Sequence, residues 1–275
     1  MNKFSLHLLF IIVALGLGGC QQNQTNESQN LTEDSTAIDT IQPIIEEEEA
    51  ETPAAADMVF NDFIDEFINK KKFQLSRVQF PLSRITDGTE QIIAQKDWTY
   101  DPIYKGEDYY TMIFDGTELY NNREDSVPRK FTVERIDLNK GRVKQYLFNK
   151  DKGLWKLVGI NEHFFKDNTN GEFYDFYAKF SSDEEYQRTH ILSAFTFKTY
   201  DIETGEYIEG TLEPEQWQEV CPELPTGIIT NFVSGEINPK SIKRTFTICS
   251  SSTEMNTTLE FRHWGGKWTL ISLEQ

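Results

Sequence analysis

In the segment Gly153-Leu-Trp-Lys-Leu-Val-Gly-Ile160, Trp155, Leu157 and Gly159 alternate with Leu154, Lys156, Val158 and Ile160. This alternation after a glycine-centred turn is the pattern of a β-strand. The same pattern returns 113 residues later, where Trp268 stands in the place of Trp155. The shared positions are Phe148, Gly153, Trp155, Leu157 and Ile160 in the first copy and Phe261, Gly266, Trp268, Leu270 and Leu273 in the second. A long internal repeat therefore organises the sequence, and this strand ends each copy.

A helix is predicted at the start of each copy. Asp57 is placed to cap a helix whose apolar residues have the spacing of one buried face, namely Phe60, Phe63, Ile64, Phe67 and Ile68. Asn170 stands at the equivalent position of the second copy, before Phe173, Phe176, Tyr177 and Phe180. One offset fits both the first helix and the last strand, which chance similarity rarely achieves.

Between these two elements, aromatic and β-branched runs broken by glycine turns predict about six strands in each copy. Matching runs are 80–82 with 194–197, 111–114 with 228–233, and 131–133 with 246–248. We therefore expect an α+β fold of two tandem domains, residues 57–165 and 166–275. Each domain is expected to pack its helix on its own curved, mainly antiparallel sheet.

The N-terminus carries an export signal. Lys3 precedes an apolar run over residues 4–17 that is short for a membrane span but fits the core of a signal peptide. The run ends in Leu17-Gly18-Gly19-Cys20, which resembles the lipobox of bacterial lipoproteins. The resemblance implies removal of residues 1–19, lipidation of Cys20 and a stable membrane anchor.

Residues 20–56 follow as an acidic, polar stretch that cannot bury enough apolar surface to order itself, so we expect a disordered tether. The residue after Cys20 is Gln21 rather than Asp, which by resemblance to the enterobacterial sorting rule favours the outer membrane. Whether the protein faces outward or into the periplasm stays open.

A leading helix, a bent sheet and a closing Gly-x-Trp-x-Leu strand resemble the cystatin-like fold of nuclear transport factor 2-like domains. With the lipobox and the tandem copies, the chain resembles an uncharacterised family of bacterial lipoproteins with that fold. The resemblance implies a cone with a cavity between helix and sheet. It implies no catalytic residues, because this fold hosts both enzymes and interaction modules.

Composition and motifs narrow the chemistry. The net charge of -18 argues against nucleic acid as a partner, because that binding relies on clustered Lys and Arg. His163, His190 and His263 fall in different predicted elements, and the sequence has no zinc, nucleotide or nucleophile motif. We therefore expect neither a metal nor a cofactor.

The corner between helix and first strand supplies two candidate binding residues. His190 replaces Arg77 in the second copy, and a polar residue at this position in both copies could point into the cone. The alternative is a structural group that satisfies its own neighbourhood at the corner.

Aromatic residues supply three more candidates. Trp98 and Tyr100, with Tyr104, Tyr109 and Tyr110 close behind, form an aromatic and polar cluster that suits a ligand pocket or a partner surface. The alternative is a core tryptophan, because Trp217 recurs at the place of Trp98.

Cys221 and Cys249 remain once Cys20 is assigned to the lipid. An oxidising envelope compartment permits a disulfide between them, while the first copy has no counterpart of either. Both the bonded and the free forms stay open.

Three functions are compatible with these features. The favoured one is a lipid-anchored, non-enzymatic envelope module that binds a small ligand or another envelope protein. The alternative is a small-molecule enzyme of isomerase or hydrolase type with its site in one cone, and a third is a structural spacer. A deep cavity facing a buried carboxylate or His190 would favour the enzyme, whereas aromatic filling would favour the module.

The lipid anchor predicts that cells fed labelled palmitate will label the native chain and not a Cys20→Ala variant, since the thioether forms on that sulfur. A Cys221→Ala variant should keep the label. Labelling of Cys20→Ala at the native level would disprove the assignment.

Overall fold

The computed structural model describes residues 55–115, 129–234, 238–250 and 256–275. The expected signal peptide, Cys20 and nearly all of the tether lie outside the described residues. Within the described part, no helix is long and apolar enough to cross a membrane.

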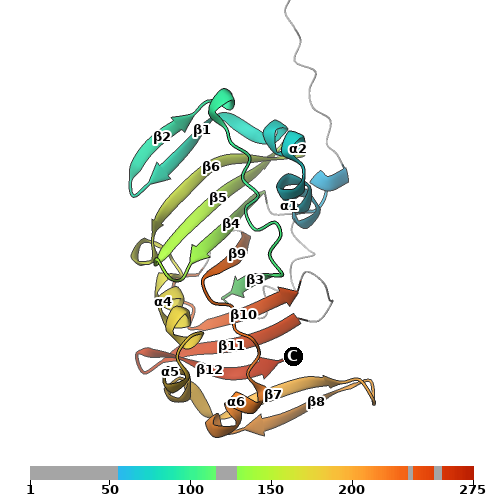
Figure 1. Ribbon diagram of the computed structural model, residues 1–275, viewed down its shortest axis with the longest axis vertical. Coiled ribbons are helices and arrows are strands. Elements are labelled where there is room, and N and C mark those ends of the chain that lie inside the picture. Colours follow the sequence, from blue (N-terminus) through green and yellow to red (C-terminus); the bar gives the residue numbers. More distant parts are fainter. Residues whose placement is uncertain (1–54, 116–128, 235–237, 251–255) are drawn as a thin grey trace, which may run out of the picture. The chain divides into compact units, whose positions relative to one another are not determined.

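The first copy begins with helices and continues with strands (Figure 1). Its helices are η1 (Ala55–Asp57), α1 (Phe60–Asn69), α2 (Lys71–Ser76) and η2 (Gln95–Asp97). Its strands are β1 (Val78–Thr86), β2 (Thr89–Ile93), β3 (Tyr109–Phe114), β4 (Lys130–Asp137), β5 (Arg142–Asp151) and β6 (Leu154–Phe164).

The second copy repeats this order. Its helices are η3 (Phe165–Asp167), α4 (Gly171–Phe180), α5 (Glu184–Thr189), η4 (Pro214–Gln216) and α6 (Trp217–Val220). Its strands are β7 (Ile191–Asp201), β8 (Glu206–Leu212), β9 (Ile228–Ser234), β10 (Lys243–Ser250), β11 (Asn256–Trp264) and β12 (Lys267–Glu274). The predicted mixed α+β fold is confirmed.

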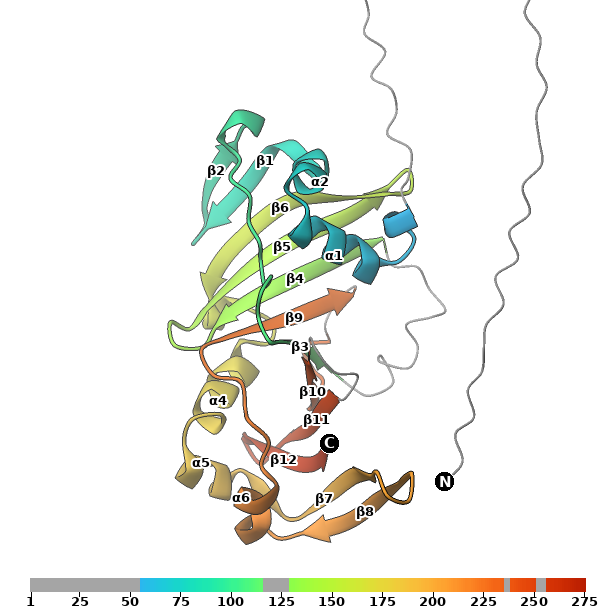
Figure 2. The ribbon, with the colours of Figure 1, turned by 45° about the vertical axis from the view of Figure 1, so that its right-hand side comes forward.

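The described strands form two six-stranded sheets, ordered β2-β1-β6-β5-β4-β9 and β3-β10-β11-β12-β7-β8 (Figure 2). Neighbours are antiparallel except β1 with β6 and β7 with β12, which are parallel. The closing strands, β6 with Trp155 and β12 with Trp268, are thus inner strands of their sheets.

Aromatic packing between the first helix and the closing strands recurs in the two copies. The Phe60 and Trp155 rings are 5.0 Å apart, and Phe173 and Trp268, 113 residues later, are 5.2 Å apart. Phe67 meets Phe148 at 5.2 Å, and Phe180 meets Phe261 at 5.3 Å. The predicted stripes are therefore buried faces, and their edge-to-face rings fill the space under each sheet.

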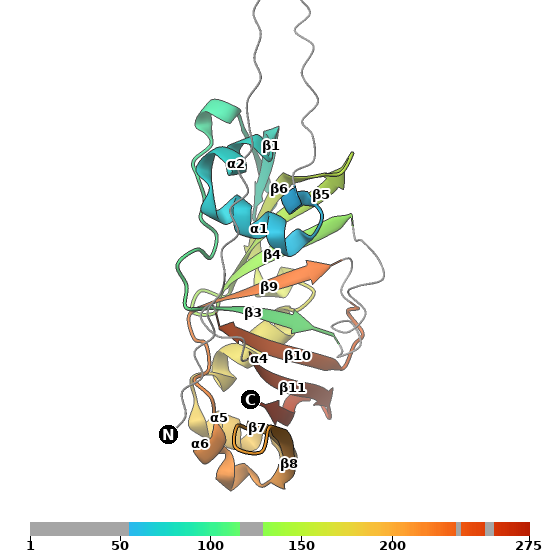
Figure 3. The same ribbon diagram turned by 90° about the vertical axis from the view of Figure 1, so that its right-hand side faces the viewer.

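One strand of each copy lies in the other copy's sheet. β3 pairs with β10, so that Met112 lies opposite Thr247, and β9 pairs with β4, so that Asn231 lies opposite Glu134. Figure 3 shows β9, β3 and β10 side by side. The expectation that each copy builds its own sheet is wrong at this strand, because alternation identifies a strand and not its partner.

Two threonines join the sheets where β3 meets β9. The Thr111 hydroxyl donates to the Thr230 carbonyl and accepts from the Thr230 N–H at 3.0 Å. The Thr230 hydroxyl donates to the Thr111 carbonyl at 3.1 Å and accepts from the Thr111 N–H at 2.8 Å. Both residues are buried, so each side chain satisfies a backbone donor and acceptor that water does not reach.

The exchange also mixes the cores. Ile113, from the first copy, packs in the cluster under the second sheet, and Phe232 and Cys249, from the second copy, pack in the cluster with α1. Neither cluster is made by one copy alone.

Asp57 does not cap α1, contrary to the prediction. The helix starts after Val59 with no side-chain cap, and the buried Asp57 carboxylate binds Arg77 at 3.0 Å and the Trp155 N–H at 3.0 Å. Asn170 occupies the N-cap position of α4, but its side chain accepts from Arg244 instead. A polar residue before an apolar stripe has the same spacing whether it caps the helix or binds a strand.

Replacing Thr111 or Thr230 by valine should lower the free energy of unfolding by about 2–3 kcal/mol each, because a buried N–H and C=O of the partner lose their bonds. The double variant should lose less than the sum, since both changes break one set of bonds. Urea unfolding measures both.

Thr269→Val is the matched control, because Thr269 is buried and its hydroxyl has no hydrogen-bond partner among the residues that the structure describes. It should be neutral or slightly stabilising. Equal losses in all three single variants would mean that the Thr111–Thr230 hydrogen bonds do not stabilise the fold.

Candidate ligand-binding pocket

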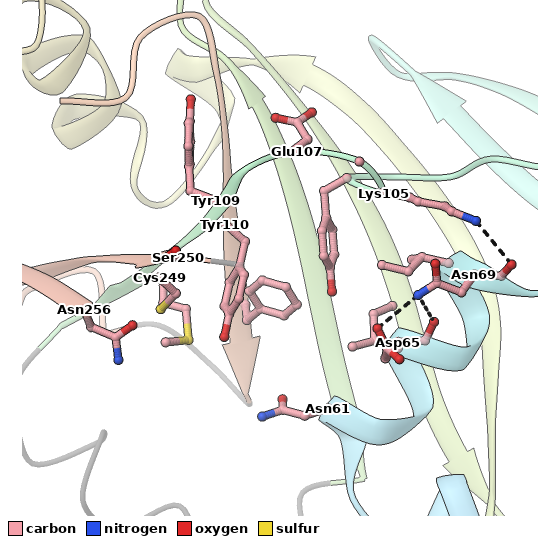
Figure 4. Close-up of a pocket in the computed structure, with 16 residues that line it drawn as sticks. Asn61, Asp65, Asn69, Lys105, Glu107, Tyr109, Tyr110, Cys249, Ser250 and Asn256 are labelled. Atoms are coloured by element: carbon pink, nitrogen blue, oxygen red, sulfur yellow. Dashed lines mark hydrogen bonds between the residues drawn. The ribbon is translucent and has the colours of Figure 1, made fainter. Parts of the chain in front are cut away.

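A pocket of about 830 Å³ lies between α1 and the strands of the exchange, β3, β9 and β10. Figure 4 draws the 16 residues that line it. The volume is within the roughly 300–1,000 Å³ of small-molecule sites. Its walls come from both copies, because Phe232, Cys249, Ser250 and Asn256 belong to the second.

Helix α1 contributes one polar row. Asn61, Asp65 and Asn69 follow at i, i+4 and i+8, so they share one side of the helix, and all three are exposed. The Asn69 amide donates to the Asp65 carboxylate at 3.0 Å, and Lys105 reaches the Asn69 carbonyl at 3.5 Å. The Asn61 side chain makes no hydrogen bond with the described part of the chain.

Three rings form the apolar wall. Phe232 stands edge-on to Tyr104 and Tyr110, with ring centroids 5.6 and 5.7 Å away, and the two tyrosines are 6.2 Å apart. Phe232 is buried, whereas both tyrosines are half-buried. Tyr109 projects from β3 on the side opposite to Tyr110 (Figure 4). Tyr104 and Tyr110 both line the pocket.

The Tyr104 hydroxyl is a neutral hydrogen-bonding group. Burial raises its pKa far above the usual value of a phenol, and the nearby charges of Asp65 and Tyr110 raise it further. It makes no hydrogen bond to another described residue, so it can donate to a ligand and accept from one.

Asp101 holds the segment that carries Tyr104. Burial alone would raise the pKa of its carboxyl, but the bonds from Lys144 at 2.6 Å and Tyr146 at 2.7 Å outweigh burial, and the pKa is lowered. The other carboxylate oxygen accepts from the Ile103 N–H at 3.0 Å. Ile103 has φ of +52°, which is strained for a β-branched residue, and the Asp101 contacts hold it there.

The equivalent space in the second copy is filled. Tyr174 and Tyr177, which stand 113 residues after Asn61 and Ile64, are fully buried, and Tyr177 stacks on Phe246 at 4.2 Å. Thus the first copy has an open pocket where the second has packed rings.

A buried carboxylate lies beside the filled space and does not line the pocket. The oxygens of Glu134 accept hydrogen bonds from four neutral side chains, those of Tyr174 at 2.6 Å, Gln145 at 2.8 Å, Asn168 at 2.8 Å and Asn231 at 3.0 Å. Its acceptor positions are occupied, so Glu134 has a structural role between the copies.

The two corner candidates both contact residues of their own copy. Arg77 is buried in its ion pair with Asp57. His190 follows the end of α5, where its Nδ1 lies 2.8 Å from the Tyr186 carbonyl and its ring stacks on Tyr186 at 3.8 Å. Neither lines the pocket. Their carbonyls accept from Leu157 and Leu270, both at 2.8 Å, so the corner itself recurs.

The aromatic candidates Trp217, Trp98 and Tyr100 all pack or hydrogen-bond within the protein. Trp217 is fully buried and donates to Gln187 at 3.0 Å. Trp98 packs edge-on to Phe80 at 6.1 Å, and the Tyr100 hydroxyl donates to the Ile68 carbonyl. None of the three tryptophan and tyrosine candidates lines the pocket, whereas the tyrosines that follow them in the sequence do.

Cys221 and Cys249 lie in different clusters. Cys249 is buried among the residues under α1, and Cys221 packs against the cluster under the second sheet and contacts the Pro222 carbonyl at 3.3 Å. Burial, with the charge of Glu184, raises the pKa of Cys221 to about 11, so its thiol is protonated at neutral pH. The two cysteines are not joined by a disulfide in this structure, and the bond between them stays a prediction.

The described residues contain no group of His, Cys, Asp and Glu that could hold a metal ion. Sequence reasoning did not find the polar row of α1, although its i, i+4, i+8 spacing is visible. No sequence pattern indicated that Phe232 and Cys249 line this pocket, because only the strand exchange brings them to α1.

The fold is that of an NTF2-like (nuclear transport factor 2-like) protein. The chain is similar to the crystal structure of an NTF2-like protein from Bacteroides fragilis NCTC 9343, with 29% identity and a TM-score of 0.74 over 82% of this chain and 98% of that one. Residues 37–275 match the family described as Domain of unknown function (DUF4348), and the chain belongs to that family. No curated protein matches it.

Asp101→Asn should destabilise the protein by about 1–3 kcal/mol at pH 7, because charge-assisted hydrogen bonds to Lys144 and Tyr146 are weakened. A lowered folded-state pKa gives stability that is complete above the unfolded value of about 4 and disappears as the pH falls through the folded value. The gap between variant and native chain should therefore close on acidification below pH 4.

Urea unfolding between pH 2.5 and 7 measures this gap. Asp97→Asn, an exposed change in the same segment, should leave stability unchanged throughout. A gap for Asp101→Asn that stays constant with pH would contradict the assignment.

Proposed function

We propose that this protein is a lipid-anchored lipoprotein of the bacterial cell envelope, with two tandem NTF2-like repeats that form a non-enzymatic binding module. Residues 57–165 and 166–275 are the repeats, Cys20 is the anchor and residues 21–56 are the tether. The outer membrane is the expected location. The pocket under α1 is the site at which the module takes its ligand.

The observation that carries the binding role is the contrast between the two copies. The first leaves about 830 Å³ open between α1 and the exchanged strands, and the second fills the same space with Tyr174 and Tyr177. An unfilled cavity lowers the stability of the fold, and larger side chains would fill it. A pocket that stays open despite this cost favours a binding role.

One pair in the pocket favours the alternative, an isomerase or hydrolase. Asp65 and Tyr104 are close enough for the carboxylate to raise the pKa of the phenol, and a carboxylate with a tyrosine can move a proton. Against it, Asp65 is exposed and its carboxylate accepts a hydrogen bond from the Asn69 amide, so solvent and Asn69 compete for the oxygens that a general base would need.

A thermal-shift screen of the full chain against a library of metabolites, oligosaccharides and short peptides tests the proposal. A pocket ligand at 100 times its Kd should stabilise the chain by about 2.7 kcal/mol and raise the melting temperature. Asn61→Tyr should abolish the shift, since it copies the residue that occupies the second copy's filled space.

Asp62→Tyr is the matched control, on the same helix and exposed but absent from the pocket lining. It should keep the shift. Hits that survive Asn61→Tyr, or no hit at all, would overturn the pocket as a binding site. Conversion of a hit into a product by the native chain, lost in Asp65→Asn, would establish the enzyme instead.

A further inference from the structure

We propose that the pocket binds a neutral carbohydrate, with one sugar ring against the half-buried rings of Tyr104 and Tyr110. This rests on the proposed binding role and adds the class of ligand.

The ring cluster is a platform rather than a cage. The centroids of Tyr104, Tyr110 and Phe232 are only 5.6–6.2 Å apart, so the rings touch one another and enclose no space. A quaternary ammonium group needs to be surrounded by ring faces to gain full cation–π attraction. The apolar C–H face of a sugar needs only one flat aromatic surface beside it.

Polar groups stand at the edge of this platform. The Asn61 amide and the Tyr104 hydroxyl both offer a donor and an acceptor, and neither is bonded to another described residue. Asp65 adds acceptor oxygens on the next turn of α1. Sugar hydroxyls donate and accept in equal measure and match such a mixed set, whereas a hydrocarbon chain would leave the polar row desolvated without partners.

Charge in the pocket disfavours anions. Two carboxylates, Asp65 and Glu107, line it with one cation, Lys105, whose ammonium already contacts the Asn69 carbonyl. Arg135 pairs with Glu107 at 3.7 Å and does not line the pocket, so a phosphate or carboxylate ligand would face the Asp65 carboxylate without an arginine in the lining to bind it. A neutral polar ligand avoids that repulsion.

Isothermal titration of the full chain with neutral oligosaccharides of α- and β-linked glucose, galactose, mannose and N-acetylglucosamine tests the class. At least one should bind. Tyr104→Phe, which keeps the ring and removes the hydroxyl, should weaken binding roughly threefold to tenfold, and Tyr110→Ala by about tenfold or more. Tyr207→Ala, an exposed change on β8, should bind like the native chain.

Choline, dodecanoate and triglycine are titrated in parallel. Tight binding of any of them that Tyr104→Phe or Tyr110→Ala weakens, in the absence of oligosaccharide binding, would overturn the carbohydrate assignment. Oligosaccharide binding that is unchanged in Tyr104→Phe would also overturn it. This variant keeps the packed ring, so the wall of the pocket stays folded. If the thermal-shift screen finds a ligand that is not a sugar and whose binding depends on the pocket, the carbohydrate assignment is wrong. The proposed binding role would then still stand.

Discussion

The reciprocal hydrogen bonds between Thr111 and Thr230 are the constraint on which the rest of the structure depends. They hold β3 against β9 at the point where each strand has left its own copy for the other's sheet. Because of this exchange, Ile113 completes one core and Phe232 the other. The two copies are therefore parts of one cooperative unit, and damage at the crossing reaches both cores.

Local chemistry predicted the elements of the fold well. The phenylalanine stripe of α1 and the Trp155 strand are short-range patterns, and their packing follows from burying one face of each. The pairing of β3 with β10 is a contact between residues more than 130 positions apart, chosen by the whole assembly. Single-sequence periodicity contains no information about that choice. The prediction that Asp57 caps α1 failed for a related reason, since its partners are Arg77, 20 residues away, and Trp155, 98 residues away.

The site was predicted only in part. The sequence suggested a ligand pocket or a partner surface at Trp98 and Tyr100, whereas Trp98 packs on Phe80, the Tyr100 hydroxyl binds the Ile68 carbonyl, and the pocket is lined by the tyrosines that follow. Residue type showed that the segment was aromatic and polar, and only backbone direction decided which ring faces the cavity. Phe232 enters through the exchange, so no pattern near it in the sequence points to α1.

The exchange within one chain also bears on how two sites can differ. In a symmetric assembly of two identical chains every residue occurs twice, so a ring that closes one pocket closes its mate. A single chain that contains both copies has no such obligation. The two copies differ in this way. Tyr174 and Tyr177 fill the space in the second copy, whereas Asn61 and Ile64 line the open pocket in the first.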